Sequence, residues 1–157
     1  MKRFAFLLLI LPACYAGWLG MLLTHEAGHV LHARLSGGVV ERVSIPLFGY
    51  SQTHLAANPS PKFVAWGGPV WGCVIPLILL ATVIRTPRRV RQAMQFFAGF
   101  CLVTNGVYLG IGWTDRVGDA GDLVRLGTPV WMLMVFGICA TAAGMLIWHR
   151  LGRTEAA

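Results

Sequence analysis

Hydrophobic positions in this chain form long apolar runs separated by short polar or glycine-rich breaks. The first run covers residues 4 to about 35 and predicts one long helix, which we expect Pro12 to bend. A helix that spans a bilayer needs about 20 apolar residues. Three further runs close to that length follow at residues 63–84, 93–113 and 129–148. The pattern therefore predicts about four transmembrane helices.

The segment between the first two runs has a different period. Glycines at 37 and 38 end the first helix, residues 39–47 are apolar mostly at odd positions, and residues 48–50 turn the chain. This alternation predicts a strand or short hairpin, with a connecting loop as the alternative. An exposed strand edge there can accept an extended peptide as an added strand. We therefore expect an all-α integral membrane protein with a short membrane-associated β-hairpin or strand after its first helix, in one domain over residues 1–157.

Composition supports a membrane location. Of the 157 residues, 56% are hydrophobic and 12% are charged, which is far too apolar for a soluble domain of this size. The net charge is +7, but the basic residues lie at the ends of the apolar runs, where snorkelling and the positive-inside rule account for them. We therefore expect a multi-pass protein of the cell membrane, in contact with the lipid bilayer, and no nucleic-acid partner.

One polar motif interrupts the first apolar run. Residues four apart share a helix face, so His25 and His29 can direct neutral imidazoles at one metal ion, and Glu26 can reach a water on that ion. This H-E-x-x-H arrangement is typical of zinc peptidases, in which the glutamate takes a proton as the water attacks a peptide carbonyl. A chance match is the alternative, but ionisable groups in an apolar helix cost roughly 2.5 to 3.5 kcal/mol each, which makes chance less favoured here.

His32 lies about 10.5 Å along the helix from His25, too far to share the ion, so we expect it to support the site or a helix interface.

A zinc site with an open position for water needs a third protein ligand. The acidic residues besides Glu26 are Glu41, Asp115, Asp119, Asp122 and Glu155. Glu41 follows the helix-ending glycines too closely to fold back easily, and Glu155 lies in the C-terminal tail, which leaves the aspartates after the third apolar run. The first and third runs end on the same side of the bilayer, so these aspartates can meet the histidines. The alternative is that Asp119 and Asp122 only favour the start of a short helix within residues 118–127.

Together these motifs resemble the site-2 protease family of intramembrane zinc metalloproteases over most of the chain. Residues 24–29 and 33–49 resemble the metal-binding helix of the family and its membrane-associated hairpin. Gly68 and Pro69 resemble its Gly-Pro motif, with Gly72 where an asparagine is often found. Asn105 and the segment from Gly118 resemble its late Asn and Asp-Gly motif, although the spacing is longer and an alanine replaces the glycine after the aspartate.

The resemblance implies that Asp119, rather than Asp122, is the third zinc ligand, and that Asn105 stabilises the tetrahedral oxyanion as an amide donor. It implies a zinc metalloendopeptidase that cleaves a peptide bond in or near a transmembrane segment of a substrate protein, with Glu26 as general base. The alternative is a catalytically inactive zinc-binding membrane protein, either a pseudoprotease or a regulatory binding protein, which the altered late motif favours. The sequence leaves the substrate's identity and the oligomeric state open.

The charge distribution and the family resemblance imply opposite orientations of the protein in the membrane. Basic residues near both termini and at residues 85–91 favour a cytoplasmic location for the termini and for that loop. The family resemblance implies instead that the C-terminal end of the first helix faces the cytoplasm. We expect the orientation that the charges favour.

Overall fold

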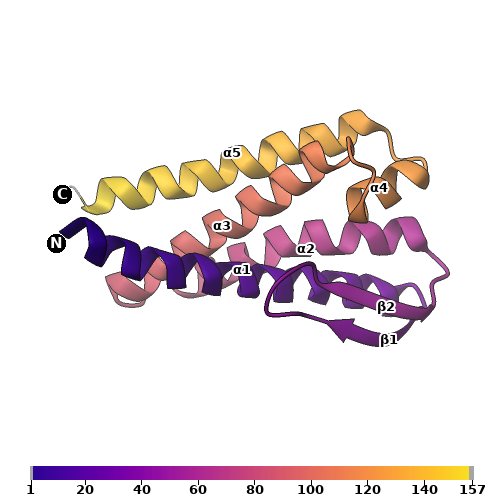
Figure 1. The fold of residues 1–157 in the computed structure, drawn as a ribbon, viewed down its shortest axis with the longest axis horizontal. Coiled ribbons are helices and arrows are strands. Elements are labelled where there is room, and N and C mark those ends of the chain that lie inside the picture. The colour runs from indigo at the N-terminus through magenta and orange to yellow at the C-terminus, as the bar shows by residue number, and fades with distance from the viewer. Residues whose placement is uncertain (1, 156–157) are drawn as a thin grey trace.

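The computed structural model describes the backbone of residues 2–155 and the side chains of residues 10–152, and it is mostly helical (Figure 1). In chain order the described elements are α1 (Lys2–Leu35), β1 (Val39–Ser44), β2 (Gln52–Ala57), α2 (Pro61–Thr82), α3 (Arg88–Gly112), α4 (Gly118–Arg125) and α5 (Val130–Glu155). The four long helices run along the length of the molecule, and the β-hairpin and α4 lie at the end away from the two termini (Figure 1). That end holds the candidate site.

Three helices in the described part of the chain are long and apolar enough to cross a membrane: α2, α3 and residues 130–152 of α5. The predicted count of about four is therefore not met. The apolar side chains of residues 4–9, at the start of α1, lie outside those described, and the histidines and glutamate of the polar motif lower the hydropathy of the remainder of this helix. Pro12 lies inside α1 without ending it.

The segment after α1 is a hairpin, as the alternation of apolar residues predicted. β1 pairs antiparallel with β2, with Val43 opposite Thr53 and Ser44 opposite Gln52. Gly49, in the connection between the strands, has a φ of 101°, which glycine adopts without strain. The second strand, β2, was not predicted separately, because residues 52–57 have no clear alternation of their own.

Glycines allow the helices that carry the site to approach closely. A Cβ atom on Gly28 of α1 would lie 2.1 Å from the carbonyl oxygen of Gly67 of α2, so no side chain fits at this crossing. A similar contact joins α3 and α5, where a Cβ atom on Gly137 would lie 2.5 Å from the Cα atom of Gly110. The first of these crossings brings the polar motif of α1 against the Gly-Gly-Pro segment of α2.

Candidate metal centre

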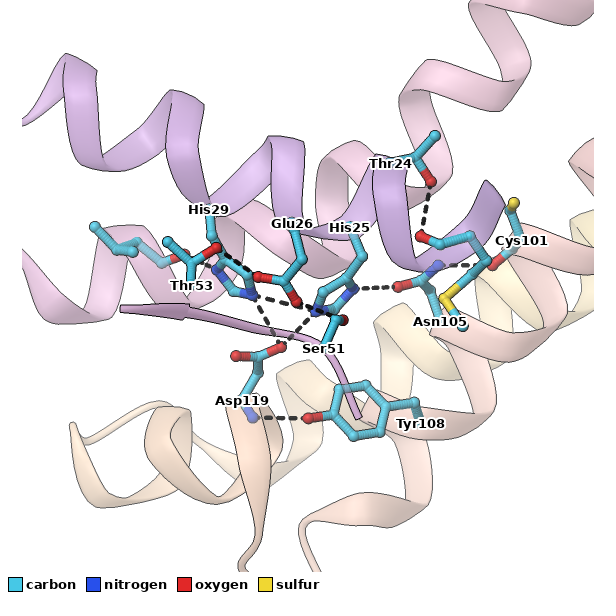
Figure 2. A network of polar contacts seen from close by, with 12 residues as sticks. Thr24, His25, Glu26, His29, Ser51, Thr53, Cys101, Asn105, Tyr108 and Asp119 are labelled. Atoms are coloured by element: carbon cyan, nitrogen blue, oxygen red, sulfur yellow. Dashed lines mark hydrogen bonds and ion pairs between the residues drawn. The ribbon is translucent and has the colours of Figure 1, made fainter. Parts of the chain in front are cut away.

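Two histidines of α1 and one aspartate of α4 converge at one point (Figure 2). The Nε2 atoms of His25 and His29 lie 3.2 Å apart. Oδ2 of Asp119 lies 2.8 Å from Nε2 of His25 and 3.3 Å from Nε2 of His29. Both histidines are buried, with exposed fractions of 8% and 7%. The structure thus brings together the three residues expected to be ligands, and together they can hold a metal ion.

The other ring nitrogen of each histidine already has a partner. Nδ1 of His25 lies 2.8 Å from Oδ1 of Asn105, whose Nδ2 donates to the carbonyl of Cys101 at 2.9 Å. Because the amide oxygen can only accept, Nδ1 of His25 carries the proton. Nδ1 of His29 likewise donates to the carbonyl oxygen of Val64 at 2.8 Å. In the neutral form of each ring, the Nε2 atom therefore directs its lone pair at the point of convergence.

This donor set fits zinc. With both rings neutral and protonated at Nδ1, two imidazole lone pairs and a carboxylate oxygen lie 2.8 to 3.3 Å apart, and they repel one another unless a metal ion or a proton lies between them. Zinc bonds of about 2.0 to 2.2 Å in a tetrahedron place neighbouring donors roughly 3.3 to 3.6 Å apart, close to these separations. Two histidines and one carboxylate also leave a fourth position for water or substrate, as catalytic zinc sites do.

The backbone of Gly68 forms one wall of this site. A Cβ atom on Gly68 would lie 2.3 Å from Nε2 of His29 and 2.5 Å from Nε2 of His25, inside the space where the donors meet. Gly72, one turn further along α2, is also required: a Cβ atom there would lie 2.8 Å from both polar atoms of the Asn105 amide. Because Gly68 and Gly72 have no side chains, α2 leaves room for a metal ion and for the amide that orients His25.

A tyrosine of α3 positions Asp119. The helix α4 starts at Gly118, which has a φ of 59°, and the preceding residue, Val117, makes no side-chain capping bond. The acceptor for the backbone N–H of Asp119 is instead the hydroxyl of Tyr108, at 2.8 Å. The ring of Tyr108 also packs edge-on against His25, with ring centroids 6.0 Å apart. Tyr108 therefore contacts both a histidine and the aspartate of the cluster.

The structure distinguishes the two candidate aspartates. Asp122 has a side chain that is 52% exposed, and it pairs with Arg125 on its own helix. The Asp119 side chain is only 16% exposed and faces the histidines. Asp119 is thus the better placed of the two aspartates to bind a metal ion together with the histidines.

Glu26 is buried beside the histidines, with an exposed fraction of 3%. Its Oε1 accepts a hydrogen bond from the Ser51 hydroxyl at 2.6 Å, and its Oε2 accepts one from the Thr53 hydroxyl at 2.5 Å. Figure 2 shows both hydroxyls turned towards the carboxylate from the hairpin. Each oxygen of Glu26 therefore has one hydrogen bond and keeps a further lone pair for a proton.

His32 lies outside the cluster, as its distance along the helix predicted. Its Nδ1 donates to the carbonyl oxygen of Phe63 at 2.6 Å, and its Nε2 accepts a bond from the indole of Trp71 at 3.0 Å. Its ring also stacks on the ring of Phe63, with centroids 3.9 Å apart. His32 is therefore a contact between α1 and α2.

The cluster opens into a cavity of about 1210 Å³ that is bounded by α1, the hairpin and α2 to α4. Drug-sized ligands typically occupy about 300 to 1,000 Å³, so the cavity is large enough for a segment of peptide. Its lining is mixed: Leu22 and Leu55 are apolar, while Glu26, Asp119 and Arg125 supply charge. The cavity beside the cluster is thus larger than a typical small-molecule site.

Sequence reasoning missed three residues of this site: Ser51, Thr53 and Tyr108. Tyr108 follows Asn105 by three positions, so the two share a helix face, and this spacing was a usable signal. Ser51 and Thr53 are two positions apart and therefore lie on one face of an extended strand. Their contact with Glu26, however, depends on how the hairpin folds back, which the local pattern does not specify.

Comparisons of the chain with models of protein families, with curated proteins and with solved structures find no match. The resemblance to the site-2 protease family therefore stays an expectation from the sequence motifs. The chemistry available to this site follows from its donor set, its buried glutamate and its cavity.

Proposed function

We propose that this protein is a membrane-embedded zinc metalloprotease of the site-2 protease type, which hydrolyses a peptide bond in or near a transmembrane segment of another protein. The observation that carries the proposal is the convergence of His25, His29 and Asp119 beside the buried carboxylate of Glu26. Three helices long and apolar enough to span a membrane accompany the site. A lipid environment and a membrane-protein substrate follow from that setting.

Each residue of the site has a distinct role in the proposed hydrolysis. Zinc held by the three ligands would supply a Lewis acid that polarises the scissile carbonyl and acidifies water. Glu26 takes a proton from the attacking water and delivers it to the leaving amine, so that water and one peptide bond give a carboxylic acid and an amine. Asn105 and the carbonyl of Val64 hold the imidazoles in the tautomer that leaves Nε2 free.

An extended substrate suits the geometry of the hairpin. A helical segment has its carbonyls engaged in its own hydrogen bonds, so it must unwind before hydrolysis. The cavity is lined on this side by β2 and the residue before it, through Ser51, Gln52, Thr53 and Leu55. Among the described strands β2 pairs only with β1, so its other edge can accept a peptide strand. Such a strand would run along the cavity beside Glu26.

One observation favours the second candidate, an inactive zinc-binding membrane protein. The amide of Asn105 is engaged by His25 on one side and by the carbonyl of Cys101 on the other. One of the two N–H donors of the amide is therefore already engaged, which leaves a single N–H for an oxyanion. A pseudoprotease would keep the donor set and the orienting amide without needing an oxyanion donor.

A reconstitution experiment separates the two candidates. The purified protein in liposomes is mixed with a panel of single-span membrane proteins, half of them carrying a helix-breaking Gly-Pro pair within the span. We expect cleavage of members of the panel, its loss when a zinc chelator strips the protein, and its return when zinc is added back. A protein that holds about one zinc per chain and leaves every panel member intact would support the inactive zinc-binding protein.

A further inference from the structure

The hairpin is held against α1 at two places. We use the term hairpin lid for residues 39–57. At one place, Ser51 and Thr53 bond to the two oxygens of Glu26 (Figure 2). At the other, the hydroxyl of Tyr15 donates to the carbonyl oxygen of Leu47 at 3.0 Å. The first contact involves the same carboxylate that the proposed function uses as the base.

The tip of the hairpin lid buries little apolar surface. Leu47, Phe48 and Tyr50 have exposed fractions of 67%, 79% and 90%. The ring of Phe48 lies 5.7 Å from that of Tyr15, centroid to centroid, and most of its surface is nevertheless exposed. Because apolar burial contributes in proportion to the area removed from water, this tip gains little stability from packing. The two hydroxyl bonds to Glu26 and the bond from Tyr15 to Leu47 therefore contribute to its docking.

Glu26 in turn depends on those hydroxyls for a fixed orientation. A glutamate side chain has three rotatable bonds, and ordering it costs conformational entropy. Two hydrogen bonds, one to each oxygen, restrict the carboxylate to one plane and position. The remaining lone pairs can then receive a proton from a water at a fixed place, which is the condition for efficient general base catalysis.

We propose that Ser51 and Thr53 are positioning residues that couple the docking of the hairpin lid to the orientation of the base Glu26. With the lid docked, both hydroxyls hold the carboxylate in place. With the lid lifted to admit a peptide, the carboxylate loses both donors and the base is no longer oriented. Hydrolysis therefore requires that the lid close again over a bound peptide. The docking itself stands on the observed hydrogen bonds, and only the effect on catalysis rests on the proposed function.

Hydrogen exchange tests the docking without any need for proteolysis. In the full-length, zinc-loaded protein, we expect the Ser51→Ala/Thr53→Val double variant to speed amide exchange over residues 50–57 by about tenfold or more, since two hydrogen bonds to a charged group are lost. Gln52→Ala is the matched control, because Gln52 lies between the two hydroxyls and its side chain is exposed. Unchanged exchange in the double variant would overturn the docking role of the two hydroxyls.

Kinetics tests the coupling to the base. Thr53→Val keeps the shape and strand propensity of threonine but removes the hydroxyl, so we expect kcat to fall about tenfold with KM and bound zinc unchanged. Thr53→Ser should restore kcat, because it returns the donor. A wild-type kcat in Thr53→Val, or a loss of zinc that parallels the loss of kcat, would overturn the positioning role.

The two measurements also separate this proposal from the proposed function. If the wild-type protein cleaves no substrate, the exchange rates still decide whether the hydroxyls hold the hairpin lid, and only the proposed function fails. If the wild-type protein cleaves and the hydroxyl variants match it in both exchange and kcat, the lid proposal fails and the proposed function stands.

Discussion

His25 and Asn105, which are 80 residues apart in the sequence, are joined by a hydrogen bond of 2.8 Å between the ring Nδ1 and the amide oxygen. This bond fixes the tautomer of the histidine and leaves its Nε2 free for a metal. The amide is anchored in turn to the carbonyl of Cys101, one helical turn earlier in α3. Asn105 therefore supports the orientation of His25 in the candidate metal centre.

The first prediction concerns this support. We expect Asn105→Ala to weaken zinc binding about 10- to 100-fold, because the imidazole of His25 loses the partner that orients it. Asn105→Asp keeps an acceptor for Nδ1 and should retain most of the affinity. Titration of zinc against a fluorescent chelator measures both variants. If the amide acts instead only on the oxyanion, both variants will bind zinc normally and lose kcat.

The second prediction concerns the third ligand. Purified Asp119→Ala should retain less than about a tenth of the zinc of the wild-type protein, because a site with two ligands holds the ion poorly. Asp122→Ala is the matched control and should keep about one zinc per chain, since Asp122 faces Arg125 and solvent. Elemental analysis of the purified variants gives the stoichiometry. Zinc loss in Asp122→Ala alone would show that the wrong aspartate has been assigned.

The third prediction uses steric exclusion and leaves every donor in place. Gly68→Ala places a methyl group where the two Nε2 atoms meet, so we expect zinc content to fall to about a tenth of wild type or less. Gly17→Ala is the control, because a Cβ atom there has its nearest neighbour at 3.5 Å, an ordinary contact. Zinc content and helical circular dichroism are measured together. Normal zinc content in Gly68→Ala would mean that the metal lies elsewhere.

The fourth prediction concerns the tyrosine that holds Asp119. Tyr108→Phe preserves the ring beside His25 but removes the acceptor for the Asp119 backbone N–H. An unsatisfied buried donor costs about 1 to 3 kcal/mol, so we expect zinc affinity to fall roughly tenfold. Tyr50→Phe, in which the lost hydroxyl belongs to a residue 90% exposed, should have no effect. Equal affinities in the two variants would argue against a supporting role for Tyr108.

Much of this site was predictable because its signals are local. The spacing of His25 and His29 fixes a shared helix face, and the alternation over residues 39–47 indicates a strand. Local spacing could not decide between Asp119 and Asp122, because the answer depends on where α4 begins. It begins at Gly118, which has a positive φ, and the next backbone N–H, that of Asp119, donates to the hydroxyl of Tyr108. The motif resemblance favoured Asp119, and in the structure Asp119 rather than Asp122 lies beside the two histidines.

Contacts between segments that are distant in the sequence could not be predicted from the hydrophobic pattern. Ser51 and Thr53 contact Glu26 only because the hairpin folds back along α1. The alternation of apolar residues predicts the strand but not the side of α1 against which the hairpin packs. Asn105 was expected to act on the oxyanion, and that role stays a prediction, whereas its contact with His25 is a finding that the 80-residue separation concealed. The predicted count of four spans was not met in the described residues, because the apolar side chains of residues 4–9 lie outside them and the polar motif lowers the hydropathy of the rest of α1.

The most direct test of the central claim measures zinc content and peptide-bond cleavage in the same preparations of wild-type protein and Glu26→Gln. Glutamine keeps the size of the side chain and an acceptor for one of the two hairpin hydroxyls, but it cannot take a proton from water. The proposed mechanism predicts that Glu26→Gln holds as much zinc as wild type, while kcat falls by a factor on the order of 100 to 10,000. Cleavage at the wild-type rate in zinc-loaded Glu26→Gln would contradict the mechanism, because the base it requires would be absent.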